Sequence, residues 1–194
     1  MQLPILSYGH EILRKQCDEI DATYPNLNTL IDNMWETMYG AHGCGLAAPQ
    51  VNIPIRLFVV DSKSTYDKME DDLREDYFVP EDTGIVETFI NASVIDESDE
   101  AWIDEEGCLS IPAIAERVKR PWSITIEYFN RQFEKQIKTF YGTTARMIQH
   151  EYDHTEGVLY LDYLKPLTRK LLQAKLDKIS KGQIQANYPM KFAK

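Results

Sequence analysis

The sequence predicts an α+β fold in which antiparallel β-strands pack around a central helix carrying an H-E-x-x-H motif, with an N-terminal and a C-terminal helix. Three observations favour this fold class. The 194 residues suit one domain. Their composition, 43% hydrophobic and 27% charged, is that of an ordinary globular protein. Strand-like segments also alternate with amphipathic ones. Apolar runs such as residues 53–60 are too short to cross a membrane, so no membrane association is expected.

The first helix is expected at residues 26–39, where apolar side chains recur three and four positions apart before Gly40 and Gly43. Four segments rich in β-branched and aromatic residues are predicted to be strands. They are residues 55–61, 89–94, 122–130 and 133–141. The last two alternate in polarity and are separated by two residues only, which indicates a hairpin.

Residues 62–84 interrupt this pattern because they are acidic, weakly periodic and contain Pro80 and Gly84. We expect a surface insertion there, either a loop or a short helix. Two further helices are predicted at residues 143–156, which Gly157 ends, and at residues 167–181. The insertion would lie within a single catalytic domain of residues 1–181, followed by a basic tail of residues 182–194.

The net charge of −10 is unevenly distributed along the chain. Residues 165–194 contain eight Lys or Arg and one acidic residue, a net charge of +7, whereas residues 1–164 carry −17. A basic C-terminal region on an acidic body suggests contact with a polyanion such as RNA. A solvated basic helix face explains the charge equally well. DNA is not expected as a partner.

Cysteine usage favours a reducing compartment. Cys17, Cys44 and Cys108 are too few and too widely spaced to form a disulfide framework. The first twelve residues also lack the features of a secretory signal. We therefore expect a cytoplasmic protein with reduced thiols, one of which could bind a metal.

The strongest local motif is H-E-Y-D-H at residues 150–154. Residues four apart on a helix lie one turn above each other, so His150 and His154 can bind one divalent metal beside Glu151. Two surface histidines at this spacing are the alternative. A catalytic site also needs a third protein ligand and an open position for water.

The third ligand is expected upstream of the motif. Glu156 follows His154 too closely, and Tyr160 stands where a third histidine would be needed. The residues alone leave several candidates open: Cys44, Cys108, His42, His10 or a carboxylate. A thiolate is a good partner for two imidazoles around Zn(II) or Fe(II).

Three segments together resemble the signature motifs of the peptide deformylases. They read GCGLAAPQ at residues 43–50, EEGCLSIP at residues 105–112 and HEYDH at residues 150–154, in the family's order. The resemblance runs from about residue 3 to residue 181. It implies that Cys108, His150 and His154 bind one divalent metal, most commonly Fe(II) in this family, with Zn(II) or Ni(II) possible. The position of Cys44 is usually aliphatic in the family, which argues against Cys44 as a ligand.

The resemblance also implies an activity, the removal of the formyl group from N-formylmethionyl nascent polypeptides with release of formate. Glu151 would act as the general base toward a metal-activated water. The side-chain amide of Gln50 and the backbone N–H of Leu109 would stabilise the negative charge on the formyl oxygen.

Further site residues follow from the resemblance and from helical spacing. Gly43 and Gly45 would let the substrate backbone approach closely. The methionine pocket would be formed by Cys44, by the stem of Glu106 and by Met147. Asp153 would hold Arg120 or orient a ligand histidine, and an exposed carboxylate is the alternative. Arg146, four positions before His150, lies on the same face of the predicted helix. It is expected to lean away from this apolar pocket.

Two rival functions remain open at this point. A metallopeptidase acting on internal peptide bonds would share the metal, the water and Glu151. A binding module with a structural metal would need a fourth protein ligand and would not use Glu151. The basic C-terminal region is also expected to dock on the ribosome near the emerging nascent chain.

Overall fold

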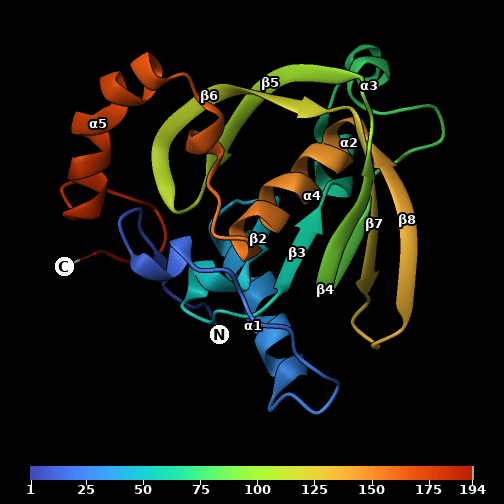
Figure 1. The fold of residues 1–194 in the computed structure, drawn as a ribbon, viewed down its shortest axis with the longest axis horizontal. Helices are drawn as coiled ribbons and strands as arrows, with labels where there is room; N and C mark the ends of the chain where they lie inside the picture. The colour runs from blue at the N-terminus through green and yellow to red at the C-terminus, as the bar shows by residue number, and fades with distance from the viewer. Residues whose placement is uncertain (194) are drawn as a thin grey trace.

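The computed structural model describes residues 1–193 (Figure 1). Its main sheet has five antiparallel strands in the order β2-β3-β4-β7-β8. Their bounds are β2 (Gly45–Ala47), β3 (Leu57–Asp61), β4 (Val86–Glu97), β7 (Ser123–Phe129) and β8 (Lys135–Tyr141). Two smaller sheets pair β5 (Ala101–Cys108) with β6 (Ile111–Pro121), and β1 (Ile5–Leu6) with β9 (Met190–Lys191).

The α-helices are α1 (Leu27–Gly40), α2 (Lys63–Lys68), α3 (Asp71–Tyr77), α4 (Gly142–Thr155) and α5 (Pro166–Ser180). Short 3-10 helices occupy Glu11–Arg14, Ala48–Val51 and Tyr160–Tyr163. The predicted α+β class is confirmed, as is the hairpin formed by β7 and β8. The acidic segment 62–84 contains α2 and α3. No helix within residues 1–193 has the length and hydrophobicity that a membrane span requires.

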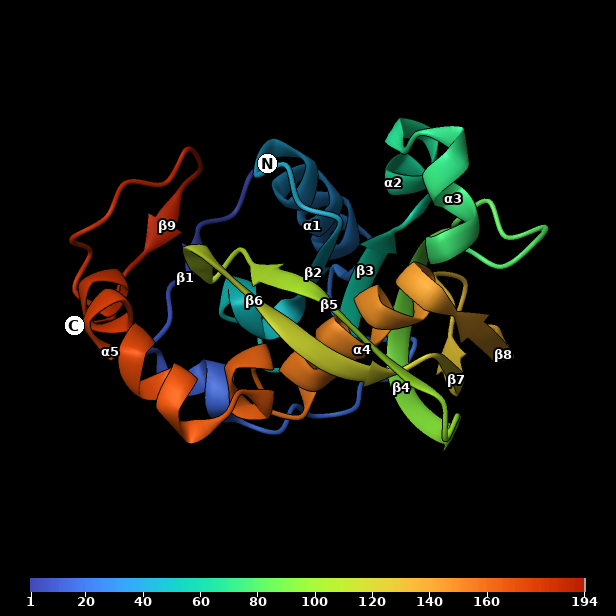
Figure 2. The ribbon, with the colours of Figure 1, turned by 90° about the horizontal axis from the view of Figure 1, so that it is seen from above.

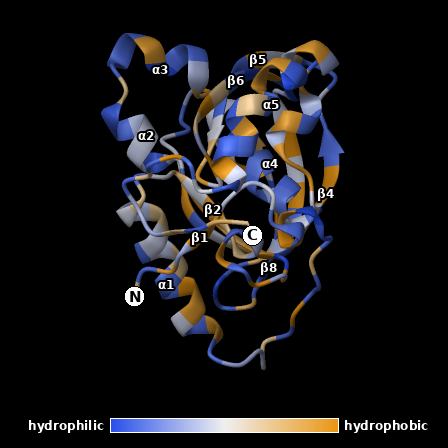
Figure 3. Cartoon of the chain, turned by 90° about the vertical axis from the view of Figure 1, so that its left-hand side faces the viewer, coloured by the Kyte–Doolittle hydropathy of each residue, from blue (hydrophilic) through white to orange (hydrophobic). Residues whose placement is uncertain are grey.

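Helices α1 and α4 cover opposite faces of the main sheet. Alternate residues of β3 show this arrangement, because Leu57 and Val59 pack in one hydrophobic cluster with α1, whereas Phe58 and Val60 pack in a second cluster with α4. All five residues of β3 are buried. Hydrophobic and hydrophilic residues alternate along the helices accordingly (Figure 3), and the apolar stripe of α1 faces the sheet. Helix α4 is thus fixed in the interior of the protein.

The β5–β6 hairpin was not expected from the sequence. Its first strand, AWIDEEGC, is rich in acidic residues, which are depleted in strands. The hairpin lies across α4 (Figure 2) and forms a third hydrophobic cluster with the 160–163 turn and α5. It brings residue 108, at its tip, to the histidines of α4.

Candidate metal centre

Helix α4 is positioned by its packing on the sheet and by its first residue. Ala145 and Ile148 are fully buried against the sheet. Gly142 starts the helix with a φ of +51°, where a side chain would also collide with the Tyr77 carbonyl. This packing fixes the rotation of α4, so that residues 150 and 154 point away from the sheet toward the β5–β6 hairpin.

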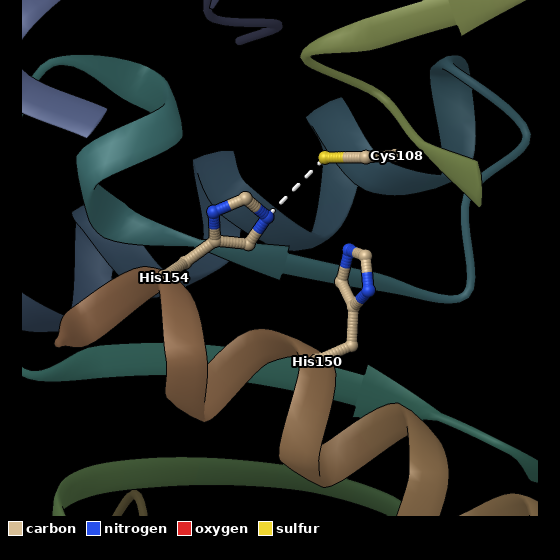
Figure 4. Close-up of side chains that lie close together, drawn as sticks. All are labelled: Cys108, His150 and His154. Carbon is tan, nitrogen blue, oxygen red and sulfur yellow. Dashed lines mark hydrogen bonds between the residues drawn. The ribbon is translucent and has the colours of Figure 1, made fainter. Parts of the chain in front are cut away.

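The structure brings Cys108, His150 and His154 together at this point (Figure 4). One ligand atom from each lies within 4.8 Å of the others, and Cys108 Sγ is 3.2 Å from His154 Nε2. Within residues 1–193 this is the one cluster of three such donors able to hold a metal. His10 lies elsewhere, with Nε2 3.0 Å from the Lys191 carbonyl oxygen.

The chemistry of these donors fits a divalent transition metal. Burial lowers the pKa of His154 well below its ordinary value, so the ring is in the neutral form that binds metals. His150 donates from Nδ1 to Glu106 Oε2 at 3.0 Å, which leaves Nε2 as its metal-binding atom. One thiolate and two imidazoles are a donor set suited to Zn(II) or Fe(II).

A buried network of charges orients His150. Glu106 Oε1 accepts from Arg120 Nε at 2.8 Å and from Arg146 Nη1 at 2.6 Å. Arg120 also donates to Asp153 Oδ2 at 2.6 Å, so the predicted partners Arg120 and Asp153 are in contact. Burial alone would raise the pKa of Glu106, but the hydrogen bonds from Arg120 and His150 hold it well below its ordinary value. Glu106 is therefore an anion that receives bonds from three neighbours.

The expected outward orientation of Arg146 is wrong. The side chain is buried, and its guanidinium stacks 4.4 Å from the centre of the Trp102 ring. It also donates to the carbonyl oxygens of Val118 and Trp102. Arg146 turns inward because the Glu106 carboxylate, from a strand distant in sequence, supplies the opposite charge.

Glu151 is buried beside the metal ligands. It is 5% exposed, and its Oε2 has no hydrogen-bond partner among the residues described. Burial raises its pKa to about 7. Gly45 on β2 makes room for it, since a Cβ at residue 45 would lie 2.7 Å from Glu151 Cγ. Packing thus confines the side chain and leaves Oε2 without a hydrogen-bond partner.

Gln50 and Leu109 lie next to Cys108. Gln50 is buried, and its Oε1 accepts from the Ala47 N–H at 2.8 Å, which fixes the orientation of the amide. Its Nε2 lies 3.5 Å from Cys108 Sγ and donates to Ser110 Oγ at 3.2 Å. Leu109 follows Cys108 directly. Sequence reasoning missed Ser110, although it belongs to the motif at residues 105–112.

These groups line a cavity of about 1040 Å³. Its wall includes the predicted substrate-binding residues Gly43, Cys44, Gly45, Glu106 and Met147, together with His150 and Glu151. The acidic segment contributes further lining residues, namely Lys68, Met69 and Tyr77. Residues 185–188 of the C-terminal segment also line the cavity. Arg120 and Asp153 are not part of this lining; Arg120 binds Glu106, and Asp153 binds Arg120. The arrangement can hold an extended ligand whose reactive group lies beside the metal ligands and Glu151.

Comparisons with known proteins give consistent matches over most of the chain. A family model described as polypeptide deformylase matches residues 2–170. A peptide deformylase of Christiangramia forsetii is 47% identical over 192 residues, covering 99% of this chain and 96% of the relative. That of Flavobacterium johnsoniae is 48% identical over 193 residues, covering 100% and 97%. The crystal structure of peptide deformylase from Ehrlichia chaffeensis matches with a TM-score of 0.80 at 30% identity, covering 94% of this chain and 99% of that chain.

Proposed function

The chain belongs to the polypeptide deformylase family of metal-dependent hydrolases, which remove the N-formyl group from nascent polypeptides, and we propose that Cys108, His150 and His154 hold its catalytic metal. One observation supports this assignment. The three donor atoms lie close together at the cavity, beside the Glu151 carboxylate, whose Oε2 has no hydrogen-bond partner. A structural metal would need a fourth protein ligand and would leave Glu151 without a role. The substrate is the N-formylmethionyl end of a nascent peptide, and the site of action is the cytoplasm.

Each step of the hydrolysis has a group in this cavity. Cys108, His150 and His154 would hold a divalent cation, which would supply the Lewis acidity that makes water nucleophilic near neutral pH. Glu151 takes the proton from the water as its oxygen bonds to the formyl carbon. When the carbon–nitrogen bond breaks, Glu151 gives that proton to the amine, and formate leaves. Because Glu151 is buried, its carboxylate stays beside the water oxygen and the amine nitrogen during both proton transfers.

Gln50 and Leu109 are the proposed donors to the formyl oxygen as it gains negative charge. Gln50 Nε2 is held next to Cys108 by the Ala47 N–H, which fixes the amide before substrate arrives. The backbone of Gly43 and Gly45 would pair with the peptide substrate. Met147, Cys44 and the stem of Glu106 would contact the methionine side chain, while the Glu106 carboxylate is engaged by the two arginines.

The test is hydrolysis of a formyl-Met peptide by the protein purified without oxygen, with formate as the readout and metal analysis of the same sample. We expect formate release and one metal per chain, with iron as the metal in the cell and Zn(II) or Ni(II) as possible replacements. An N-acetylated internal peptide of the same length serves as the control. Cleavage of that peptide without formate release from the formyl peptide would instead identify a metallopeptidase.

Replacing Gly45 by Ala is expected to lower kcat by about 100-fold, because a displaced catalytic group loses about this factor. The new methyl group would occupy the space of Glu151 Cγ, and the buried glutamate would have to move. Gly107→Ala is the matched control beside the metal ligand Cys108. Its Cβ would meet no atom closer than 3.8 Å. Equal rates for the two variants would contradict the placement of Glu151.

Ribosome docking is proposed to use α5. Its exposed lysines include Lys170 and Lys175, and Leu167 and Leu171 are 69% and 74% exposed on the same helix. We expect the double variant Lys170→Glu, Lys175→Glu to lose co-sedimentation with ribosomes at low salt, because phosphate contacts depend on the cations. The control changes two exposed lysines of the acidic body, Lys15→Glu and Lys119→Glu. Equal pelleting of both variants and the wild type would exclude docking through α5.

A further inference from the structure

The C-terminal segment after α5 returns to the metal centre. Strand β9 runs parallel to β1, and the two lie side by side in Figure 2. Ile5 donates its N–H to the Pro189 carbonyl oxygen and Ser7 to that of Lys191, both at 2.9 Å. This pairing holds residues 185–188 against the cavity, where they form part of its wall.

Tyr188 reaches from this segment to the tip of the β5–β6 hairpin. Its hydroxyl donates to the Leu109 carbonyl oxygen at 2.8 Å. Its half-buried ring packs against the hydrophobic cluster of α1. Because β5 ends at Cys108 and β6 starts at Ile111, Leu109 and Ser110 are the two residues of the turn.

Other contacts hold Ser110, whereas Leu109 receives its one side-chain hydrogen bond within residues 1–193 from Tyr188. The Ser110 carbonyl oxygen accepts from the Tyr8 N–H at 2.7 Å, and its hydroxyl accepts from Gln50. The bond from Tyr188 restricts the peptide unit that follows Leu109. The Leu109 N–H lies on the preceding peptide unit, which joins Leu109 to the Cα of Cys108. Rotation of the turn would therefore move the Leu109 N–H and also the Cys108 side chain.

We propose that Tyr188 is a positioning residue for the deformylation reaction, acting through its hydrogen bond to the Leu109 carbonyl. The bond holds the turn so that the Leu109 N–H faces the oxygen that gains charge in the transition state. Fixed donors stabilise such charge without reorganisation during the reaction. This inference rests on the proposed function, in which the Leu109 N–H is one of the two donors.

The role of the hydroxyl can be separated from that of the ring. Tyr188→Phe removes the hydrogen bond and keeps the ring in its cluster. Because the bond would matter in the transition state, kcat and kcat/KM should fall together while KM stays constant. A merely structural role would lower the melting temperature and the folded fraction without changing kcat per folded, metal-loaded molecule.

The experiment compares formyl-Met peptide hydrolysis by the full-length wild type, Tyr188→Phe and Tyr24→Phe, each corrected for folded fraction and metal content. Tyr24 packs in the same cluster, and its hydroxyl makes no hydrogen bond within residues 1–193. We expect kcat of Tyr188→Phe to fall about 10-fold with KM unchanged, as for loss of one hydrogen bond that acts in the transition state. Tyr24→Phe should keep the wild-type kcat.

The outcomes distinguish this inference from the proposed function. A wild type that releases no formate would overturn both. A wild type that does release formate, with kcat of Tyr188→Phe within twofold of it, would overturn the positioning role alone. An equal loss in Tyr24→Phe would also overturn it, because the loss would then come from packing in the cluster.

Discussion

Glu151→Gln is expected to lower formate release by about 1000-fold while one metal per chain stays bound, since positioned acid–base groups contribute about 100- to 10,000-fold. Glutamine has the size of glutamate but cannot accept the proton of water. Glu151 makes no hydrogen bond through Oε2, so the substitution removes no structural contact of that atom. The measurement is single-turnover hydrolysis of a formyl-Met peptide, with metal analysis of each sample.

Glu156→Gln is the matched control. Glu156 caps the C-terminal end of α4 and pairs with Arg56, away from the cavity. Its replacement should reduce stability slightly and leave kcat at the wild-type value. Wild-type turnover by Glu151→Gln would exclude a general-base role. Loss of the metal from Glu151→Gln would instead show that Glu151 supports the ligands.

Local sequence patterns predicted the elements that pack by their own periodicity. The apolar stripe of α1 and the alternation of β7 and β8 are visible in short windows, and the structure confirms them. The β5–β6 hairpin has no such pattern, because its acidic first strand is stabilised by side chains of other elements. Arg120 and Arg146 neutralise Glu106, and the cluster with α5 covers the second strand. Such partners are set by tertiary structure.

The residues of the candidate site also divide into those that local patterns predict and those that only tertiary structure brings together. His150, Glu151 and His154 share one helix, so their spacing alone indicated a metal site. Cys108 is more than 40 positions away, and only the resemblance singled it out from Cys44 and the other candidates. Helical spacing correctly placed Arg146 on the His150 side of α4. The inward direction of the Arg146 side chain depends on its ion pair with Glu106. No local sequence pattern predicts that Glu106 lies near Arg146.

Glu106→Gln is expected to lower the free energy of unfolding by about 3–5 kcal/mol, the usual cost of removing one partner from a buried ion pair. The Glu106 side chain is 4% exposed, and those of Arg120 and Arg146 are 3% and 6% exposed. A glutamine amide would present N–H groups, which are donors, to the guanidinium donors of Arg120 and Arg146. The buried positive charge of these arginines would then lack its compensating carboxylate. Arg120 would keep Asp153 as a partner. Urea unfolding of the metal-loaded proteins measures the change.

The same substitution should weaken metal binding by about 10- to 100-fold, because Glu106 fixes the ring of His150 from behind. Competition with a chelator measures this effect separately from unfolding. Glu105→Gln is the control on the same strand, since Glu105 is exposed and its replacement should change stability by less than about 0.5 kcal/mol. If Glu106→Gln and Glu105→Gln unfold alike, the buried arginines must be stabilised by their carbonyl contacts and Asp153. In that case Glu106 would act on His150 alone, and the chelator competition would still show weaker binding.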